Sequence, residues 1–417
     1  MKVYVKSKAG NWLMPTYPAK ARYLLKQGKA KVISRTPFSI QLTYETSELT
    51  QDIVVGIDDG GIHVGIACVA NDESIYQEEL NLRTDIKSKM DTRRSYRRGR
   101  RYRNCRYRQP RFLNRGNSTK SNRIPPSIKS KKDAIVRTIS KLPLPTPVLI
   151  RLEDAYFDFQ AMDDPTITGK GYQQGEMLYQ KNFKSACKTR DGFKCRVCGT
   201  SENLQVHHLK PKATGGTDRL SNLMTLCQTH HREHHNNGLK LPKQRSTFYR
   251  FASHVQQGKY YLQAQLSKIA PLETTFGYII AYHRRKHHIE KSHCNDAVVI
   301  AQTGVQPSQH YLKSNCIQLR KRSLHEATAR RGRKQANHTQ KRNFKNVFKL
   351  KGFQKWDCVN VFGQIGFISG FTGTSAYVLD INGQYIKQPN KSYKQVTLSK
   401  IQRLYSNQDR ISALCVA

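Results

Sequence analysis

The chain has 417 residues, enough for two or three domains with cores of their own. Its 72 Lys and Arg against 29 Asp and Glu give a formal net charge of +43. Because so large a charge repels itself in a compact state, we expect a polyanionic partner, and nucleic acid is the natural one. No apolar run approaches the roughly 18 residues of a transmembrane helix, and the first residues lack the apolar stretch of a signal peptide, so membrane anchoring is not expected.

The first 50 residues predict a small α/β domain. A helix is expected to begin at Tyr17, and Gly28 can cap its C-terminal end. Residues 31–33 and 38–42 have the pattern of strands. The next apolar strand, residues 53–58, delivers Asp58 at its end. Residues 64–69 then form the return strand of a hairpin.

An arginine-rich stretch follows the hairpin. Residues 92–132 contain no acidic side chain, and residues 93–115 hold eleven arginines interleaved with three tyrosines. A helix here would have no apolar face to bury, so we expect phosphates around it. A nuclear-localisation signal or disordered tail is the alternative, but the interior position argues against a tail. The residues predicted to contact nucleic acid are Arg93, Arg94, Arg97, Arg98, Arg100, Arg101, Arg103, Arg106, Arg108 and Arg111.

Two more acidic residues stand in a context like that of Asp58. Glu153 ends the apolar strand 148–153, and Asp296 lies in a helix-like segment with His293 one turn earlier on the same face. Carboxylates that converge from separate elements are what two-metal phosphodiester hydrolysis requires. Asp59 adds a competing carboxylate beside Asp58, but the sequence favours Asp58 as the ligand.

A metal-binding module lies between the second and third of these acids. Its two C-x-x-[CH] pairs, Cys195 with Cys198 and Cys227 with His230, have the spacing of a tetrahedral structural zinc site. Zinc alone could indicate a simple binding finger. The loop between the pairs and the residues just beyond it argue for more, since they contain His207, His208, Asn222, His231 and His235. The remaining cysteines are scattered singly, which is typical of a reducing, cytoplasmic compartment.

The end of the chain predicts a β-rich domain. A second basic stretch near residues 330–342 precedes apolar runs at 359–371 and 376–381. Asn382-Gly383 is a strong hairpin signal. A small barrel-like domain is therefore expected there.

The metal-binding module resembles the HNH, or ββα-metal, nuclease family across LQVHHLKP, GGTDRLSNLMTLC and HHREHH. The resemblance implies that His208 is the general base and that His207, His231 and His235 bind a catalytic divalent cation. Asn222 would brace the loop that orients the base. The histidine run leaves the register open by one residue, because His230 and His234 could exchange roles with His231 and His235.

The acidic motifs GIDDGGIHVGIA, RLEDAYFD and KSHCNDAVVIA resemble those of the RuvC-type RNase H fold. By that match Asp58, Glu153 and Asp296 would bind Mg²⁺ or Mn²⁺, and His293 would assist. The order of all motifs is similar to that of the IscB family, transposon-associated RNA-guided nucleases related to CRISPR type II effectors. Residues 13–15 and 36–38 are similar to its N-terminal PLMP domain, although Trp12 replaces the first proline.

The expected fold is a multidomain α+β protein. It has an RNase H-like (RuvC) α/β core split in three, an arginine-rich bridge helix, an inserted zinc-stapled HNH domain and a small β-rich C-terminal domain. The predicted boundaries are 1–50 (PLMP-like), 51–90 (RuvC-I), 91–116 (bridge helix), 117–165 (RuvC-II), 166–183 (linker), 184–238 (HNH), 239–246 (linker), 247–317 (RuvC-III) and 318–417 (basic segment and β-rich domain that interacts with target or RNA).

The function implied by the resemblance is RNA-guided cleavage of both DNA strands by a prokaryotic, monomeric protein. Its partners would be a guide RNA of the omega type and double-stranded target DNA. The HNH unit would cut the guide-paired strand and the RuvC unit the displaced strand. Two alternatives stay open: a guide-free structure-specific or homing endonuclease, and a catalytically idle nucleic-acid-binding protein.

Overall fold

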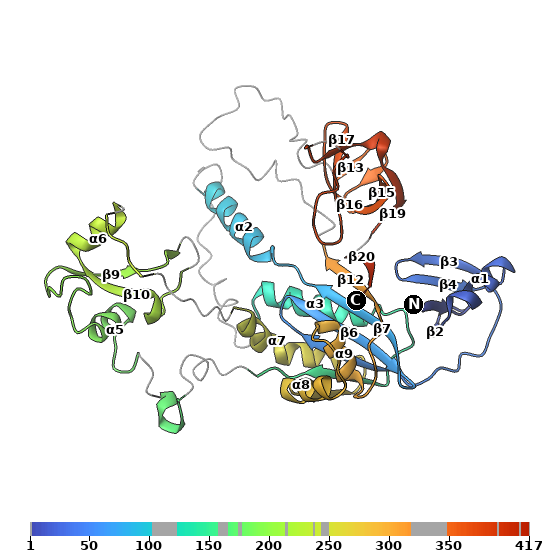
Figure 1. Ribbon diagram of the computed structural model, residues 1–417, viewed down its shortest axis with the longest axis horizontal. Helices are drawn as coiled ribbons and strands as arrows, with labels where there is room; N and C mark the ends of the chain where they lie inside the picture. The colour runs from blue at the N-terminus through green and yellow to red at the C-terminus, as the bar shows by residue number, and fades with distance from the viewer. Residues whose placement is uncertain are drawn as a thin grey trace. The chain divides into compact units, whose positions relative to one another are not determined.

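The computed structural model divides into two compact units, Met1–Ala155 with Phe251–Ala417, and Tyr156–Arg250 (Figure 1). In the described part of the chain, no helix is both long and apolar enough to cross a bilayer. The residues that the structure describes are 2–101, 123–156, 166–173, 177–212, 216–236, 238–242, 250–317, 348–389, 392–407 and 410–416.

A seven-stranded sheet is the centre of the larger unit, with the order β11-β8-β5-β6-β7-β12-β20. The predicted hairpin is confirmed, because β5 and β6 pair antiparallel and β7 continues the run. β8 then lies parallel to β5, and β11 lies parallel to β8. The strands are β5 (Val54–Asp59), β6 (His63–Ala70), β7 (Glu73–Asn81), β8 (Leu149–Glu153), β11 (Leu272–Thr275), β12 (His310–Cys316) and β20 (Arg410–Val416).

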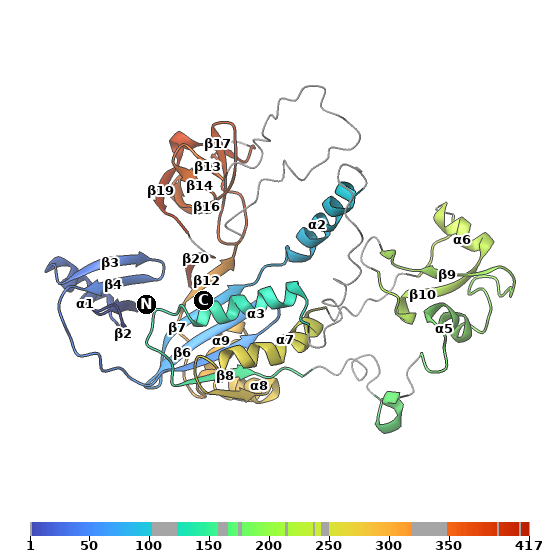
Figure 2. The same ribbon diagram turned by 180° about the vertical axis from the view of Figure 1, so that it is seen from behind.

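Helices cover both faces of this sheet, as Figures 1 and 2 show. Successive strand residues face opposite sides, so Val55 and Ile57 pack with α3 and α7 while Val54 packs with α9. α8 in turn packs on α9 through Ile280 and Val299. The helices are α3 (Pro126–Ile139), α7 (Arg250–Leu266), α8 (Gly277–Lys286) and α9 (His293–Ala301).

The first residues form a small domain within the larger unit, with sheet order β2-β1-β4-β3. Helix α1 ends at Lys26, and Gly28 follows with a φ of +70°, as its predicted capping role requires. The core holds Val3, Val5 and Ile40. The elements are β1 (Val3–Lys6), β2 (Trp12–Thr16), α1 (Pro18–Lys26), β3 (Ala30–Arg35) and β4 (Phe38–Leu42).

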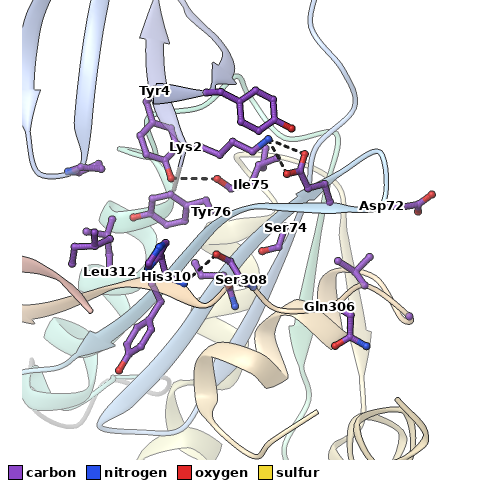
Figure 3. Close-up of a pocket in the computed structure, with 18 residues that line it drawn as sticks. Lys2, Tyr4, Asp72, Ser74, Ile75, Tyr76, Gln306, Ser308, His310 and Leu312 are labelled. Carbon is purple, nitrogen blue, oxygen red and sulfur yellow. Dashed lines mark hydrogen bonds and ion pairs between the residues drawn. The ribbon is translucent and has the colours of Figure 1, made fainter. Parts of the chain in front are cut away.

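A cavity of about 560 Å³ lies where this domain meets β7 and β12 (Figure 3). On its wall, Tyr4 Oη donates to the carbonyl of Ile75 at 3.3 Å, and Lys2 pairs with Glu73 at 2.8 Å. None of the residues predicted to be functional lines this cavity. The candidate chemistry therefore lies elsewhere in the molecule.

The predicted bridge helix is present as α2, Ile86–Arg101, and begins five residues before the expected start at 91. Arg93 and Arg94 are exposed on it. Arg97, Arg98, Arg100 and Arg101 belong to the helix, but their side chains lie outside the described part. Arg103, Arg106, Arg108 and Arg111 lie outside the described residues altogether.

The C-terminal region builds a five-stranded sheet with order β18-β17-β16-β15-β19, preceded by a short hairpin of β13 and β14. Its core gathers Val359, Ile368 and Val378. The hairpin expected at Asn382-Gly383 is closed by a bridge between Leu379 and Tyr385. The strands are β13 (Lys349–Leu350), β14 (Phe353–Gln354), β15 (Cys358–Val361), β16 (Gln364–Thr372), β17 (Ser375–Leu379), β18 (Gln395–Thr397) and β19 (Gln402–Tyr405).

The last strand, β20, returns to the central sheet and pairs with β12 along its length. Arg410 on β20 makes an ion pair of 3.0 Å with the fully buried Glu78. The sequence places this strand in the C-terminal domain, whereas the structure makes it an edge of the central sheet. Pairing across about a hundred residues leaves no local signal in the sequence.

The smaller unit contains a two-stranded antiparallel sheet flanked by helices. β9 (Leu204–His208) pairs with β10 (Leu223–Cys227), which leads directly into α6 (Gln228–His235). This is the ββα order that the sequence predicts. Helix α5 (Phe183–Arg190) packs on the sheet through Ala186 and Cys187.

Candidate functional site

Three predicted carboxylates come together in the larger unit. Asp58 lies at the end of β5 and Glu153 at the end of the adjacent parallel strand β8, so the pair share one edge of the sheet. Asp296 approaches from the first turn of α9, which packs on β5. Three segments separated by more than 90 residues in sequence therefore contribute one acidic cluster.

His293 binds this cluster directly. Its Nδ1 lies 2.6 Å from Asp58 Oδ2, and this hydrogen bond raises the pKa of His293 above its ordinary value. His293 is the first residue of α9, whose N-cap Ser292 accepts a hydrogen bond from the backbone of Asn295. Gly60 faces the imidazole, and any Cβ at this position would overlap the ring.

The cluster holds more negative charge than a buried site tolerates. Burial, together with a hydrogen bond that protonated Glu153 donates to Asp58, raises the pKa of Glu153 to about 8. Burial and the charge of Asp58 likewise raise the pKa of Asp296, although Arg284 at 3.0 Å opposes the rise. Clustered carboxylate oxygens are the donors that Mg²⁺ and Mn²⁺ prefer, so the residues fit the implied cations.

The structure separates Asp58 from its neighbour Asp59. Adjacent strand residues face opposite sides, so Asp58 faces α9 while Asp59 faces α3. There Asp59 forms an ion pair with Lys132, and both side chains are almost fully buried. Asp59 is thus held away from the carboxylate cluster, and Asp58 is the better candidate ligand.

Asp296 is nevertheless engaged by a cation of the protein itself. Arg284 on α8 holds its Oδ1. In the described part of the chain, the donor sets whose atoms all lie within 4.8 Å of one another are a cysteine-rich set and a histidine set, and the three carboxylates are not among them. The three carboxylates can therefore supply oxygen ligands to a metal ion, but their oxygen atoms lie farther apart than those of a closed metal site.

The raised pKa of Glu153 predicts a pH-dependent stability. Its folded value of about 8 exceeds the unfolded value of 4.5, so the unfolded chain binds fewer protons between these limits. The free energy of unfolding contributed by Glu153 must then fall as pH rises from 4.5 to 8. Without added divalent cation, Glu153→Gln should raise the thermal midpoint at pH 8 and leave it nearly unchanged at pH 5.

Thermal denaturation at the two pH values, with and without Mg²⁺, measures this effect. Mg²⁺ should stabilise the parent protein more than Glu153→Gln, because the amide is a poorer ligand. The exposed Glu273, paired with Arg151 on the neighbouring strand, supplies the matched control Glu273→Gln. A thermal midpoint of Glu153→Gln equal to that of the parent protein at both pH values would contradict the raised pKa of Glu153.

The four predicted zinc ligands converge in the smaller unit. The Sγ atoms of Cys198 and Cys227 lie 3.9 Å apart, and His230 Nδ1 lies 3.2 Å from Cys227 Sγ and 3.7 Å from Cys195 Sγ. Ligands about 2.3 Å from a tetrahedral zinc are separated by about 3.8 Å. The distances therefore fit a zinc ion.

A second donor set is made of histidines. His207 on β9 faces His231 and His235 on α6, with donor atoms all within 4.8 Å of one another. Burial, reinforced by the neighbouring imidazoles, lowers the pKa of His207 to about 4. The ring is therefore neutral at pH 7, the form that binds metal. Its Nε2 is buried and has no hydrogen-bond partner among the described residues, as expected of a ligand atom.

The same geometry distinguishes the two histidine registers left open by the sequence. His230 belongs to the cysteine set, as its distances to two thiols show. His234 Nδ1 donates to the carbonyl of Leu239 at 2.9 Å. His231 and His235, one turn apart on α6, are therefore the better candidates for the second set.

His208 and Asn222 organise the loop beside this set. Asn222 is fully buried, and its side chain accepts from the Lys210 amide at 2.8 Å and donates to the carbonyls of Lys210 and Thr217. His208 Nε2 lies 2.8 Å from Asp218 Oδ1. Asp218 is absent from the predicted site, because an acid in a polar loop carries no local signal that it will meet a histidine ten residues away.

Family models match two parts of this chain. A model of the family described as RRXRR protein matches residues 3–175, and a model of the HNH endonuclease family matches residues 195–237. Anaredoxin of Nostoc sp. (strain PCC 7120 / SAG 25.82 / UTEX 2576) is 34% identical over 55 residues, which cover 13% of this chain and 72% of that protein. Residues 195–237 therefore form an HNH endonuclease domain, and the chain is IscB-like. The matches confirm the prediction of an HNH endonuclease.

Solved Cas9 structures are also similar to this HNH protein. Streptococcus thermophilus Cas9 in complex with the AGAA PAM is 15% identical, with 43% of this chain and 26% of that chain covered at a TM-score of 0.30. The Type II-C Cas9 enzyme from Actinomyces naeslundii is 16% identical, with 44% and 30% covered at a TM-score of 0.17. The chain thus spans under a third of either Cas9, and these TM-scores do not establish a shared fold.

Proposed function

We propose that the chain is an RNA-guided DNA endonuclease that cuts both strands of its target by metal-dependent hydrolysis. The observation that carries the proposal is the presence of two separate candidate catalytic sets in one strongly basic chain. The carboxylate cluster belongs to one compact unit and the histidine set to the other. The HNH segment is inserted between Glu153 and Asp296, so two acids of the outer site flank the inner one.

The strand order supports a RuvC-type assignment of the central sheet. Three antiparallel strands, β5 to β7, are extended by the parallel strands β8 and β11, with helices on both faces. This is the arrangement expected of an RNase H-like core, and it puts the carboxylates at one end of neighbouring strands. The zinc-stapled ββα unit is proposed as the HNH counterpart.

At the carboxylate site, Asp58, Glu153 and Asp296 would hold divalent cations. Bound cations would polarise the scissile phosphate and lower the pKa of the attacking water. His293, hydrogen-bonded to Asp58, is placed to hold that carboxylate or to accept a proton at Nε2. Arg284 must release Asp296, or share it, for all three acids to act together.

At the HNH site, His207, His231 and His235 would hold one cation through neutral imidazoles. The Nε2 hydrogen of His208 is directed to Asp218, which leaves the lone pair at Nδ1 free to accept a proton from water. Asn222 keeps the loop between these residues in place. The resemblance assigns the guide-paired strand to this site and the displaced strand to the carboxylates.

Nucleic-acid binding follows from charge. The net charge of +43 and the exposed Arg93 and Arg94 on α2 favour an extended phosphate contact. We propose that α2 holds the guide RNA and that the C-terminal sheet contacts the RNA scaffold or a short motif beside the target. Base pairing would then provide sequence specificity while the protein provides charge, shape and metal.

One experiment tests directly whether the protein binds a guide RNA. The protein is expressed together with its native flanking DNA and purified, and the bound RNA is sequenced. One RNA species should copurify, and a changed guide segment should redirect cleavage to a matching plasmid. Cleavage without RNA at branched DNA would indicate the guide-free endonuclease. Binding without cleavage under any guide or divalent cation would indicate the idle protein.

A further inference from the structure

Helix α8 exposes an unusual group of aromatic side chains. Phe276, Tyr278 and Tyr282 are 44%, 74% and 62% exposed, although they lie within seven residues of one another. The rings of Phe276 and Tyr278 are parallel within 9°, with centroids 5.9 Å apart. Contiguous exposed aromatic side chains of this kind are typical of binding surfaces.

The group is a distinct face of the helix. Tyr278, Tyr282 and Arg285 follow one another at i, i+4 and i+7, so they form one exposed stripe. The opposite side of α8 is already occupied, because Ile280 packs on α9 and Arg284 pairs with Asp296. The side chains of the stripe therefore lie on the side of α8 that does not pack against α9.

The stripe begins directly beside the carboxylate cluster. Gly277 lies between Phe276 and Tyr278, and a Cβ at this glycine would meet Glu153 Oε1 at 2.7 Å. Thr275, two residues earlier, is the register partner of Glu153 in the sheet. Phe276 and Tyr278 are the chain neighbours of this glycine, so both residues lie close to Glu153, since neighbouring Cα atoms are only about 3.8 Å apart.

Charge and ring chemistry together indicate the occupant. The last turn of α8 is basic, with exposed Arg285 and Lys286, and the helix carries no acidic residue. Flat aromatic faces bind the faces of unpaired bases, while the adjacent cations bind the phosphates that connect them. A duplex hides its base faces by stacking, so a single strand is the form that can use both features.

We propose that Phe276, Tyr278 and Tyr282 form a stacking platform for unpaired bases of the DNA strand cut at the carboxylate cluster. Arg285 and Lys286 contact the phosphates of that strand. The platform holds the strand so that its scissile phosphate reaches Asp58, Glu153 and Asp296. The inference rests on the proposed function in taking this cluster as the site that cuts single-stranded DNA.

The test uses the full-length ribonucleoprotein and a target with a different label on each strand. Tyr278→Ala with Tyr282→Ala should slow single-turnover cleavage of the displaced strand about tenfold or more, the scale of one or two lost stacking contacts. Cleavage of the guide-paired strand should keep its parental rate. Replacing both residues by phenylalanine should restore the rate, and Tyr23→Ala, at an exposed tyrosine of α1, should change neither strand.

Unchanged displaced-strand cleavage in the double alanine variant would overturn the platform. An equal loss on both strands would also overturn it, because that pattern indicates contact with the guide RNA or a general defect. Thermal denaturation shows whether the variant remains folded.

A second measurement is independent of guiding. The full chain should quench or shift the fluorescence of a deoxyoligonucleotide carrying 2-aminopurine, and the double alanine variant should lose this signal. If the protein shows no guided cleavage but retains a signal that depends on Tyr278, the proposed function fails while the platform stands. If guided cleavage is present and the signal is the same in the variant, the platform alone fails.

Discussion

Asp58→Ala should convert a double-strand cut into a nick of the guide-paired strand. Asp58 is the carboxylate shared by Glu153 and His293, so its loss removes both a candidate metal ligand and the partner that orients the imidazole. Metal catalysis contributes several kcal/mol to such reactions, so displaced-strand cleavage should fall by about 10³-fold or more. Strand-specific labels resolved on a denaturing gel measure both products.

His208→Ala should give the complementary nick, in the displaced strand, because it removes the candidate general base of the HNH site. His235→Ala should have the same effect by removing a candidate metal ligand. His234→Ala is the matched control on the same helix, since His234 donates to the Leu239 carbonyl and lies outside the ligand set. Cutting of both strands by either Asp58→Ala or His208→Ala would show that the roles are wrongly assigned.

Loss of the zinc ion should unfold the HNH unit and leave the central sheet intact. In the described residues of this unit, the buried apolar side chains form small clusters around Leu223 and Leu226. Structural zinc supplies about 10–16 kcal/mol in zinc-finger peptides, as much as the total stability of a typical domain. Cys227→Ser should therefore release zinc and increase hydrogen exchange across residues 184–238.

Cys187→Ser is the matched control for this prediction. Cys187 is also a fully buried cysteine of the HNH unit, but it contacts Thr225 and Asp191 and lies outside the zinc set. Zinc content by mass spectrometry should stay at one ion per chain in Cys187→Ser and fall in Cys227→Ser. Full zinc occupancy in Cys227→Ser, with unchanged exchange protection, would contradict the assignment.

Local patterns in the sequence were sufficient to mark candidate ligands that are close together in the chain. Cys195 and Cys198, or Cys227 and His230, are connected by a single turn, so their spacing alone indicates a shared metal. The HNH domain could be recognised for the same reason, since its residues lie within about 50 positions. Apolar strands that end in an acid likewise marked Asp58 and Glu153.

Contacts made between distant segments could not be predicted in this way. The ion pairs of Asp59 with Lys132, of Asp296 with Arg284 and of Glu78 with Arg410 join residues that lack any common motif. The same holds for the β20 strand, which reaches the central sheet from the opposite end of the chain. The exposed aromatic face of helix α8 likewise depends on which side of the helix packs on α9, and no sequence motif predicts it.

The sequence by itself determined which residue types are candidates for the chemistry, because metal ligation and basic charge depend on composition and short spacings. Only the tertiary structure decided which of two adjacent candidates is the better placed. Strand alternation turns Asp58 toward His293 and Asp59 toward Lys132. His234 donates to the Leu239 carbonyl, whereas His231 and His235 face His207. These choices depend on which face packs against which neighbour, and such packing is a property of the folded chain.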